Sequence, residues 1–144
     1  MKYPKLLNTA MAAILLGVAA FGSLAQEQSD QVALSAGGVS YVSGGVGTAS
    51  IDRLDSLAAD FNLKLVFALK AGDYVSGVKV TISDAVGKML LDTTSQGPWL
   101  LARLPAGNYQ IVASFAGNAE RRTVTIGSEK LRTVDFRWAS QAPR

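Results

Sequence analysis

The sequence contains no cysteine and no histidine. Without a thiol, the chain itself supplies no disulfide, no cysteine nucleophile and no thiolate metal ligand. Without an imidazole, it supplies no Ser-His-Asp triad, no histidine general acid or base and none of the usual histidine-containing zinc sites. Carboxylate, lysine or tyrosine chemistry remains, and the sequence presents no constellation suited to it. We therefore predict a non-catalytic protein with no catalytic, metal or cofactor-binding residues and no cofactor.

The chain also lacks a strong excess of one charge, since 14 Lys and Arg residues against 11 Asp and Glu residues give a formal net charge of +3. Basic residues gather late, with seven against three acidic residues over 103–144. This distribution favours an anionic partner, although solvated strand faces explain it as well. The longest basic run is Arg121-Arg122, which is too short to predict nucleic-acid binding.

The N-terminus carries an export pattern. Two lysines within the first five residues precede an apolar run from Ala10 to Phe21, and small residues follow at Ser23 and Ala25. This order is typical of a secretory signal peptide, here residues 1–25, cleaved after Ala25. The alternative is a retained anchor, but spanning a bilayer takes about 20 apolar residues, so we expect no stable membrane insertion after cleavage. The predicted location is periplasmic or secreted.

Residues 26–47 are rich in Gln, Ser and Gly, and this composition predicts a flexible leader in which Val39, Tyr41 and Val42 are candidates for a short ordered patch. The glycines at 44, 45 and 47 resemble part of a phosphate-binding loop. The Lys and the Ser or Thr that such a loop requires are missing, so we do not predict a nucleotide site.

A single amphipathic helix is predicted over residues 48–62. Ser50 suits its N-cap, Asp52 and Asp55 suit the positive end of the helix dipole, and Asn62 suits its C-terminal exit. This placement accounts for the two acids better than a catalytic or metal-binding pair does. The apolar stripe recurs every three or four residues, at Ile51, Leu54, Leu57, Ala58 and Phe61.

From Leu63 onward the apolar period changes to two, which predicts strands that have one buried face. Seven short strands separated by turn residues indicate a sandwich or a barrel. The fold class we predict is mainly β, a seven-stranded Greek-key β-sandwich over 63–138 with one short N-terminal amphipathic helix and a tail over 139–144. The expected strands are 63–70, 78–83, 88–93, two runs within 97–115, 120–126 and 131–138.

The two runs within 97–115 flank Leu104-Pro105-Ala106-Gly107. Proline presets φ for a tight turn and glycine accepts φ > 0, so this segment predicts a β-hairpin. Tyr109 follows two residues after the glycine, a spacing that suggests a tyrosine corner in which the phenol hydroxyl bonds to the backbone just upstream. We interpret Leu104, Pro105, Gly107 and Tyr109 as a structural turn.

A set of short segments carries a family resemblance. They are Val78-Lys79-Val80-Thr81-Ile82, Asp84, Gly87, Gly97-Pro98-Trp99, Leu104-Pro105-Ala106-Gly107-Asn108-Tyr109 and Thr123-Val124-Thr125-Ile126. Together they resemble a carboxypeptidase regulatory-like domain of the transthyretin-like (prealbumin-like) superfold. The resemblance covers about residues 63–138 and implies a compact seven-stranded sandwich that serves as an accessory or binding module in exported bacterial proteins. The zinc carboxypeptidase domain that such modules often accompany is absent, and the related hydroxyisourate hydrolases use histidines, so neither activity carries over.

The function predicted from these features is a non-catalytic binding or accessory module whose partner is another envelope protein or an anionic envelope component. Exposed edge strands accept partners by strand addition, and we expect 131–138 or 63–70 to serve as such an edge. Possible partner-binding residues are Trp138 and a basic face that we expect Arg121, Arg132 and Arg137 to form. Packing within the sandwich also explains Trp138, as it does Trp99.

Two alternative functions remain. The first is a structural or assembly subunit of an envelope complex. The second is a metal-dependent hydrolase built from acids near turns, namely Asp73, Asp84 and Asp92. Asp84 already begins a predicted turn that ends at Gly87, and no calcium-loop spacing is present.

Overall fold

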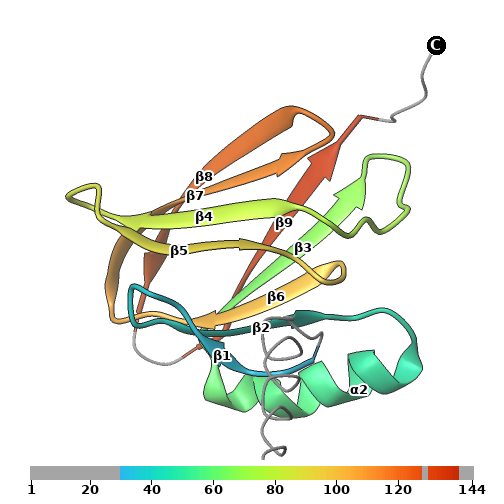
Figure 1. The fold of residues 1–144 in the computed structure, drawn as a ribbon, viewed down its shortest axis with the longest axis horizontal. Helices are drawn as coiled ribbons and strands as arrows, with labels where there is room; N and C mark the ends of the chain where they lie inside the picture. The colour runs from blue at the N-terminus through green and yellow to red at the C-terminus, as the bar shows by residue number, and fades with distance from the viewer. Residues whose placement is uncertain (1–29, 128–129, 140–144) are drawn as a thin grey trace, which may run out of the picture.

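The computed structural model describes residues 30–127 and 130–139. Within them the chain forms nine strands in two sheets, and one short helix lies on the outer side of the larger sheet (Figure 1). One sheet has the strand order β1-β2-β6-β3-β9 and the other has the order β5-β4-β7-β8. The strands are β1 (Ala33–Leu34), β2 (Ser40–Gly44), β3 (Leu63–Leu69), β4 (Lys79–Asp84), β5 (Met89–Thr94), β6 (Trp99–Arg103), β7 (Gly107–Phe115), β8 (Asn118–Ile126) and β9 (Arg132–Trp138).

The predicted mainly β fold, with two sheets and one short helix, is confirmed, whereas residues 30–127 and 130–139 form nine strands rather than seven. All seven predicted strands are present, as β3 to β9. The predicted signal peptide, the start of the predicted leader and residues 140–144 of the predicted tail lie outside the described residues.

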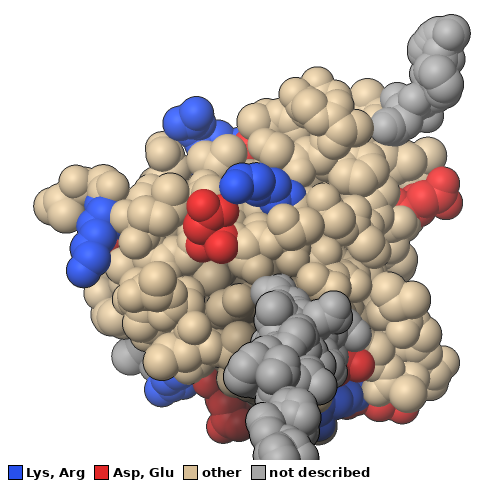
Figure 2. All heavy atoms as spheres, in the orientation of Figure 1, with Lys and Arg blue, Asp and Glu red and all other residues tan. Residues whose placement is uncertain are grey.

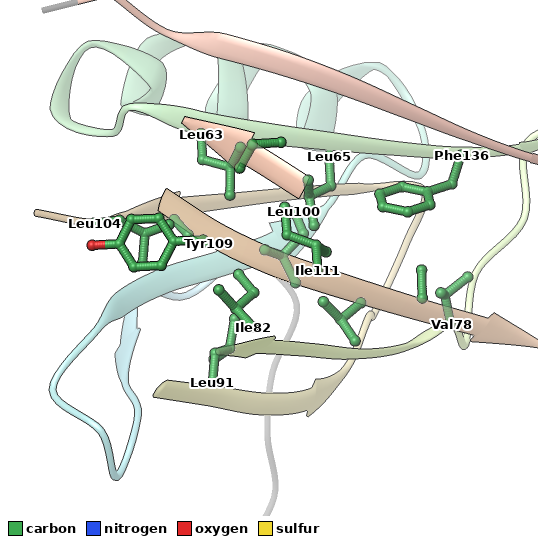
Figure 3. Packing of buried hydrophobic residues seen from close by; sticks show 14 of the residues in the cluster. Leu63, Leu65, Val78, Ile82, Leu91, Leu100, Leu104, Tyr109, Ile111 and Phe136 are labelled. Atoms are coloured by element: carbon green, nitrogen blue, oxygen red, sulfur yellow. The ribbon is translucent and has the colours of Figure 1, made fainter. Parts of the chain in front are cut away.

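The main core lies between the two sheets and follows the alternation of the sequence. On β7, for example, Tyr109, Ile111 and Ala113 are buried, and the residues between them are only partly buried. Figure 3 shows Leu63, Leu65 and Leu100 of the five-stranded sheet facing Ile82 and Ile111 of the four-stranded sheet. Burying each such side chain contributes about 1.5–3 kcal/mol, so the core holds the sheets together without a disulfide.

A second apolar cluster lies on the opposite face of the five-stranded sheet, under helix α2 (Thr48–Leu57) and the short 3₁₀ helix η2 (Ala58–Asp60). Leu54 and Phe61 from the predicted stripe are buried there against β2 and β6. Strand β6 is therefore covered on both faces: Leu100 packs in the sandwich core and Leu101 packs under the helix.

The predicted start of the helix is wrong in detail. Gly47, at φ 87°, occupies the N-cap, and the first turn carries no acidic residue because Asp52 and Asp55 lie further along. Ser50 is buried inside the helix, where its hydroxyl accepts the Gly45 N–H at 2.7 Å and donates to the Asp30 carboxylate. The N-cap therefore lies three residues before the predicted Ser50, because a backbone glycine, rather than a side-chain cap, makes the entry turn.

Strands β1 and β2 come from the segment predicted to be a flexible leader, and that prediction is wrong for residues 30–44. Val39 and Val42 are buried in the two apolar clusters, and β2 pairs along its length with β6. A Cβ atom on Gly37 would lie 2.5 Å from the Leu90 carbonyl oxygen. Glycine thus permits close backbone packing here. Residues 30–44 therefore fold onto the sandwich, although their composition is typical of a linker.

Strands β6 and β7 do not form the predicted hairpin. Strand β6 pairs with β2 and β3, and β7 pairs with β4 and β8 in the other sheet. The segment Leu104–Ala106 therefore carries the chain from one sheet to the other. The same turn residues are compatible with a hairpin and with a crossover between sheets. The unbroken apolar run in β6 favours the crossover, because such a strand requires cover on both faces and therefore lies inside the five-stranded sheet.

Candidate binding edges of the sandwich

The turn at Tyr109 forms the predicted tyrosine corner. The Tyr109 hydroxyl donates a 2.6 Å hydrogen bond to the Pro105 carbonyl oxygen, and Gly107 adopts φ 156°, which L side chains rarely do. Burial, together with the nearby Asp84 carboxylate, raises the pKa of the Tyr109 hydroxyl. This site is structural, as the sequence predicts.

Asn62 is a second anchor of this corner. Its place after the helix predicted only a helix exit, so this role was not expected from the sequence. Its side-chain amide donates to the Leu104 carbonyl oxygen at 2.7 Å and accepts the Leu104 N–H at 2.9 Å. Asn62 precedes β3, so it fixes the start of that strand to the crossover. An amide at a strand entry is the one sequence signal that suggests such a role.

Two of the three acidic candidates, Asp84 and Asp92, make contacts that stabilise the fold. Within residues 30–127 and 130–139, no group of three or more acidic residues is placed to hold a metal ion. Asp84 accepts the Val86 and Lys88 N–H groups in the turn between β4 and β5, and Asp92 pairs with Lys79 at 3.0 Å. These contacts account for the two carboxylates as structural groups.

The three candidate arginines do not share a face. On β8, Val124 and Ile126 are buried, so Arg121 points out from the four-stranded sheet. On β9, Phe136 and Trp138 are buried, so Arg137 points out from the five-stranded sheet, on the opposite side of the sandwich. Figure 2 likewise shows few and scattered charges on the face that it presents. The expected basic face is therefore absent among the described residues.

Arg132 lies between these two faces, at the start of β9, and its guanidinium donates to the Thr125 carbonyl oxygen of β8 at 3.2 Å. Trp138 is 3% exposed, and its indole N–H donates to the Asn118 carbonyl oxygen at 2.9 Å. Its ring also packs beside those of Phe67, Phe115 and Phe136. The proposed contact of Trp138 with a partner is therefore wrong, because the side chain belongs to the core.

Trp99 is half-buried beside the cluster under the helix, and the Lys64 ammonium group lies 3.5 Å from its ring centroid. A cation already covers this ring, so Trp99 is explained by packing.

Four strands lie at sheet edges within the described residues, and they occupy two sides of the sandwich. Strands β8 and β9 share one side, as the Arg132 and Trp138 bonds show. Strands β1 and β5 share the other, because the Ser35 hydroxyl donates to the Leu90 carbonyl oxygen of β5 at 2.7 Å. Strand 63–70, expected as an edge, is instead β3, which lies between β6 and β9.

The side formed by β8 and β9 is charged. Glu120 and Arg122 occupy core-facing positions of β8 and form a 3.4 Å ion pair, and the Arg122 guanidinium lies 5.1 Å from the Phe136 ring centroid. Asp135 and Arg137 alternate along β9. Inward-pointing charges and charged edge residues oppose pairing with a further strand. This side is therefore poorly suited to receive one.

The side formed by β1 and β5 exposes apolar side chains, and the one charged residue within these two strands is Asp92, which pairs with Lys79. Val32 is 49% exposed, Leu34 is 70% exposed, and Met89 at the start of β5 is 51% exposed. Solvent-exposed apolar groups that gather at an unpaired edge favour an interaction surface. This side was not expected from the sequence, because β1 lies in the segment predicted to be a flexible leader.

Two clefts flank β1. A cleft of about 480 Å³ lies between Val32, the end of the helix at Leu57 and Phe61, and Arg103. We call it the helix-side cleft. A smaller cleft of about 240 Å³ lies between Leu34, Tyr41 and Met89, and we call it the β5-side cleft. Both open beside the strand whose outer edge carries no partner strand within the described residues.

Comparison of the sequence with models of protein families and with curated proteins returns no match. Within the described residues, no helix is long and apolar enough to cross a membrane.

Proposed function

We propose that this chain is a non-catalytic binding module that acts in the periplasm or outside the cell, after removal of residues 1–25, and that its partner is another envelope protein. The observation that carries the proposal is the contrast between the two sides of the sandwich. Exposed apolar side chains gather at the edges β1 and β5, where Leu34 and Met89 lie, and charges occupy the edges β8 and β9. Apolar contact at an open strand edge is suited to a protein partner.

An anionic envelope component is the second candidate partner. It is less well supported because Arg121 and Arg137 point to opposite faces and Arg132 already binds the Thr125 carbonyl oxygen. A site for an anionic head group needs cations that converge on one place.

We also propose that residues 63–138 form a carboxypeptidase regulatory-like domain with Greek-key connectivity. Two features support this proposal: β3 to β9 supply seven strands over that segment, and β4 lies beside β7 although β5 and β6 intervene along the chain. The accessory role implied by the resemblance agrees with a binding module. Strands β1 and β2 and the helix then form an addition at one edge.

The proposal is tested by crosslinking the chain in its native envelope and identifying its neighbours. A photoreactive residue at Leu34 is compared with one at Arg121, an exposed position on the opposite side. We expect one envelope protein to be crosslinked from position 34 and not from position 121. Equal crosslinking from both positions, or none from position 34, would contradict the proposal, and light scattering on the purified chain distinguishes a self-assembling subunit by a mass that rises with concentration.

A further inference from the structure

We propose that the outer edge of β1 receives an extended, uncharged segment of a partner protein as an added strand, whose successive side chains enter the helix-side and β5-side clefts in turn. The inference rests on the proposed function, which it makes specific. It follows from the backbone of β1, from the two clefts and from the distribution of charge.

The backbone supplies the first argument. The Ser35 N–H donates to the Val39 carbonyl oxygen at 2.8 Å, so Ser35 directs its backbone groups toward β2. Antiparallel strands alternate in this respect, and Ala33 pairs opposite Tyr41, so the N–H and C=O groups of Leu34 point away from β2. Within residues 30–127 and 130–139 these groups have no hydrogen-bond partner. A further strand is the structure that pairs with outward-facing groups of this kind.

The arrangement of the sheets supplies the second argument. Strands β9 and β8 close one side of the sandwich together, and the five-stranded sheet has one strand more than the four-stranded sheet. The larger sheet therefore extends past β5 at the other side, and the extending strand is β1. This offset leaves all of β1 exposed. An added strand would cover it.

The clefts supply the third argument. Side chains of a strand point alternately to opposite faces of its sheet. The helix-side cleft opens on the outer face of the five-stranded sheet, beside Val32 and Phe61, and the β5-side cleft opens toward the other sheet, beside Tyr41 and Met89. One side chain of an added strand thus meets the first cleft and the next meets the second. Backbone pairing supplies affinity in this mode, and alternate pockets supply specificity.

Strand β5 is not the acceptor, although it shares this side. The Ser35 hydroxyl donates a hydrogen bond to the Leu90 carbonyl oxygen. Gly37 lies so close to β5 that a Cβ atom added to it would be 2.7 Å from Leu90 Cα. The loop between β1 and β2 therefore covers the edge of β5 at that point. The apolar walls at Tyr41 and Met89 then favour an aliphatic or aromatic side chain in the β5-side cleft, and the Asp92 carboxylate, which also lines this cleft, disfavours an acidic one.

The test uses a defined probe, the peptide carboxyfluorescein-Thr-Val-Thr-Val-Thr-Val-amide, whose label is joined to the N-terminal nitrogen. We expect it to bind the full chain, and the chain that begins at Gln26, with saturable anisotropy at or below about 1 mM, and to slow hydrogen exchange at the Leu34 amide. The same peptide with every amide N-methylated keeps its side chains but cannot pair as a strand, so it should not bind. Binding of the methylated peptide, or no binding of the parent peptide by the wild-type chain, would overturn strand addition.

Two pairs of variants locate the site. Leu34→Pro removes the outward N–H without removing a bond to β2, and edge positions of this kind tolerate proline. We expect it to weaken peptide binding about tenfold, with Leu34→Ala, which keeps the N–H, showing a smaller loss. Met89→Lys should weaken binding by introducing a charge at the β5-side cleft, whereas Val46→Lys, an exposed apolar position outside both clefts, should leave binding unchanged. Equal effects within either pair would contradict the assignment.

Other occupants of the edge give distinct results. If the Leu34 amide is already protected in the full chain and becomes exposed in the chain that begins at Gln26, residues 1–25 cover the edge and the partner proposal is wrong. Protection that rises with protein concentration would show a second copy instead. Peptide binding without any crosslinked envelope protein would leave the strand site intact and remove the proposed function, and the reverse result would remove only the strand site.

Discussion

Tyr109 and Pro105 are joined by a 2.6 Å hydrogen bond from the phenol hydroxyl to the carbonyl oxygen four residues earlier. This bond closes the segment in which the chain leaves the five-stranded sheet and enters the four-stranded sheet. Asn62 holds Leu104, at the other end of the same segment, through two hydrogen bonds. The crossover is therefore fixed to both sheets, and its stability can be measured one bond at a time.

Replacing Tyr109 by phenylalanine removes the hydroxyl and keeps the buried ring. We predict that Tyr109→Phe lowers the free energy of unfolding by about 0.5–1.5 kcal/mol, the net contribution of one hydrogen bond, as measured by urea denaturation. Tyr74→Phe is the matched control, because Tyr74 is largely exposed and its hydroxyl has no partner among the described residues. Peptide binding at β1 should be unchanged in both variants. Equal stability of the wild-type chain and Tyr109→Phe would show that the corner bond contributes nothing.

The same hydroxyl predicts a dependence on alkaline pH. Burial and the Asp84 carboxylate raise the pKa of Tyr109 in the folded chain above its ordinary value of 10.0. Below pH 10 the hydroxyl keeps its proton in both the folded and the unfolded chain, so its contribution to the free energy of unfolding is fully present. As the pH rises from about 10 through the folded pKa, the unfolded state loses its proton first, and the free energy of unfolding falls. The difference in melting temperature between wild type and Tyr109→Phe should therefore shrink over this range, and a constant difference would contradict the shift.

Asn62 provides an independent test of the crossover. We predict that Asn62→Ala lowers the free energy of unfolding by about 1–3 kcal/mol, because the N–H and C=O groups of the buried Leu104 both lose their partner. Asn118→Ala is the control, since its side chain makes only a long 3.5 Å contact on an exposed turn. Its expected effect is within about 0.5 kcal/mol. Equal effects in urea denaturation would place the anchor elsewhere.

The sequence predicts the strands β3 to β9 well because each has apolar residues at a period of two and a turn at its end. Val124 and Ile126, for example, are both buried, as their alternation with threonines indicates. The same logic fails for β1 and β2, which are short and lie among glycines. Their order comes from pairing with β6 and from close backbone packing, and neither leaves a periodic signal in the sequence.

The candidate site was less predictable than the fold. Arginines close in the sequence suggested a basic face, but which face a strand residue occupies depends on the sheet that its strand joins. Arg121 and Arg137 both lie at odd positions of strands whose even positions face the core, and they diverge because β8 and β9 belong to different sheets. The exposed edge at Leu34 depends on the number of strands in each sheet, which periodicity does not determine.

Gly97 and Gly44 offer a test of the close packing that orders the N-terminal strands. A Cβ atom on Gly97 would lie 2.3 Å from the Gly44 carbonyl oxygen and 2.5 Å from its carbon, and both are backbone atoms that cannot rotate away. Gly97→Ala must therefore push β2 away from the turn before β6. We predict a loss of about 1–3 kcal/mol in the free energy of unfolding, the usual cost of overpacking.

Gly127→Ala is the matched control for this substitution, because no atom lies within 4 Å of the Cβ position at Gly127. Without a clash, an added methyl group mainly restricts the unfolded chain, so we expect stability to be unchanged or slightly higher. The contact between Gly97 and Gly44 would be disproved by equal stability of the two variants. Hydrogen exchange in Gly97→Ala, compared with the wild type, should increase more in β2 than in β7. This result would place the damage at β2, because β7 belongs to the other sheet and is not displaced by the clash.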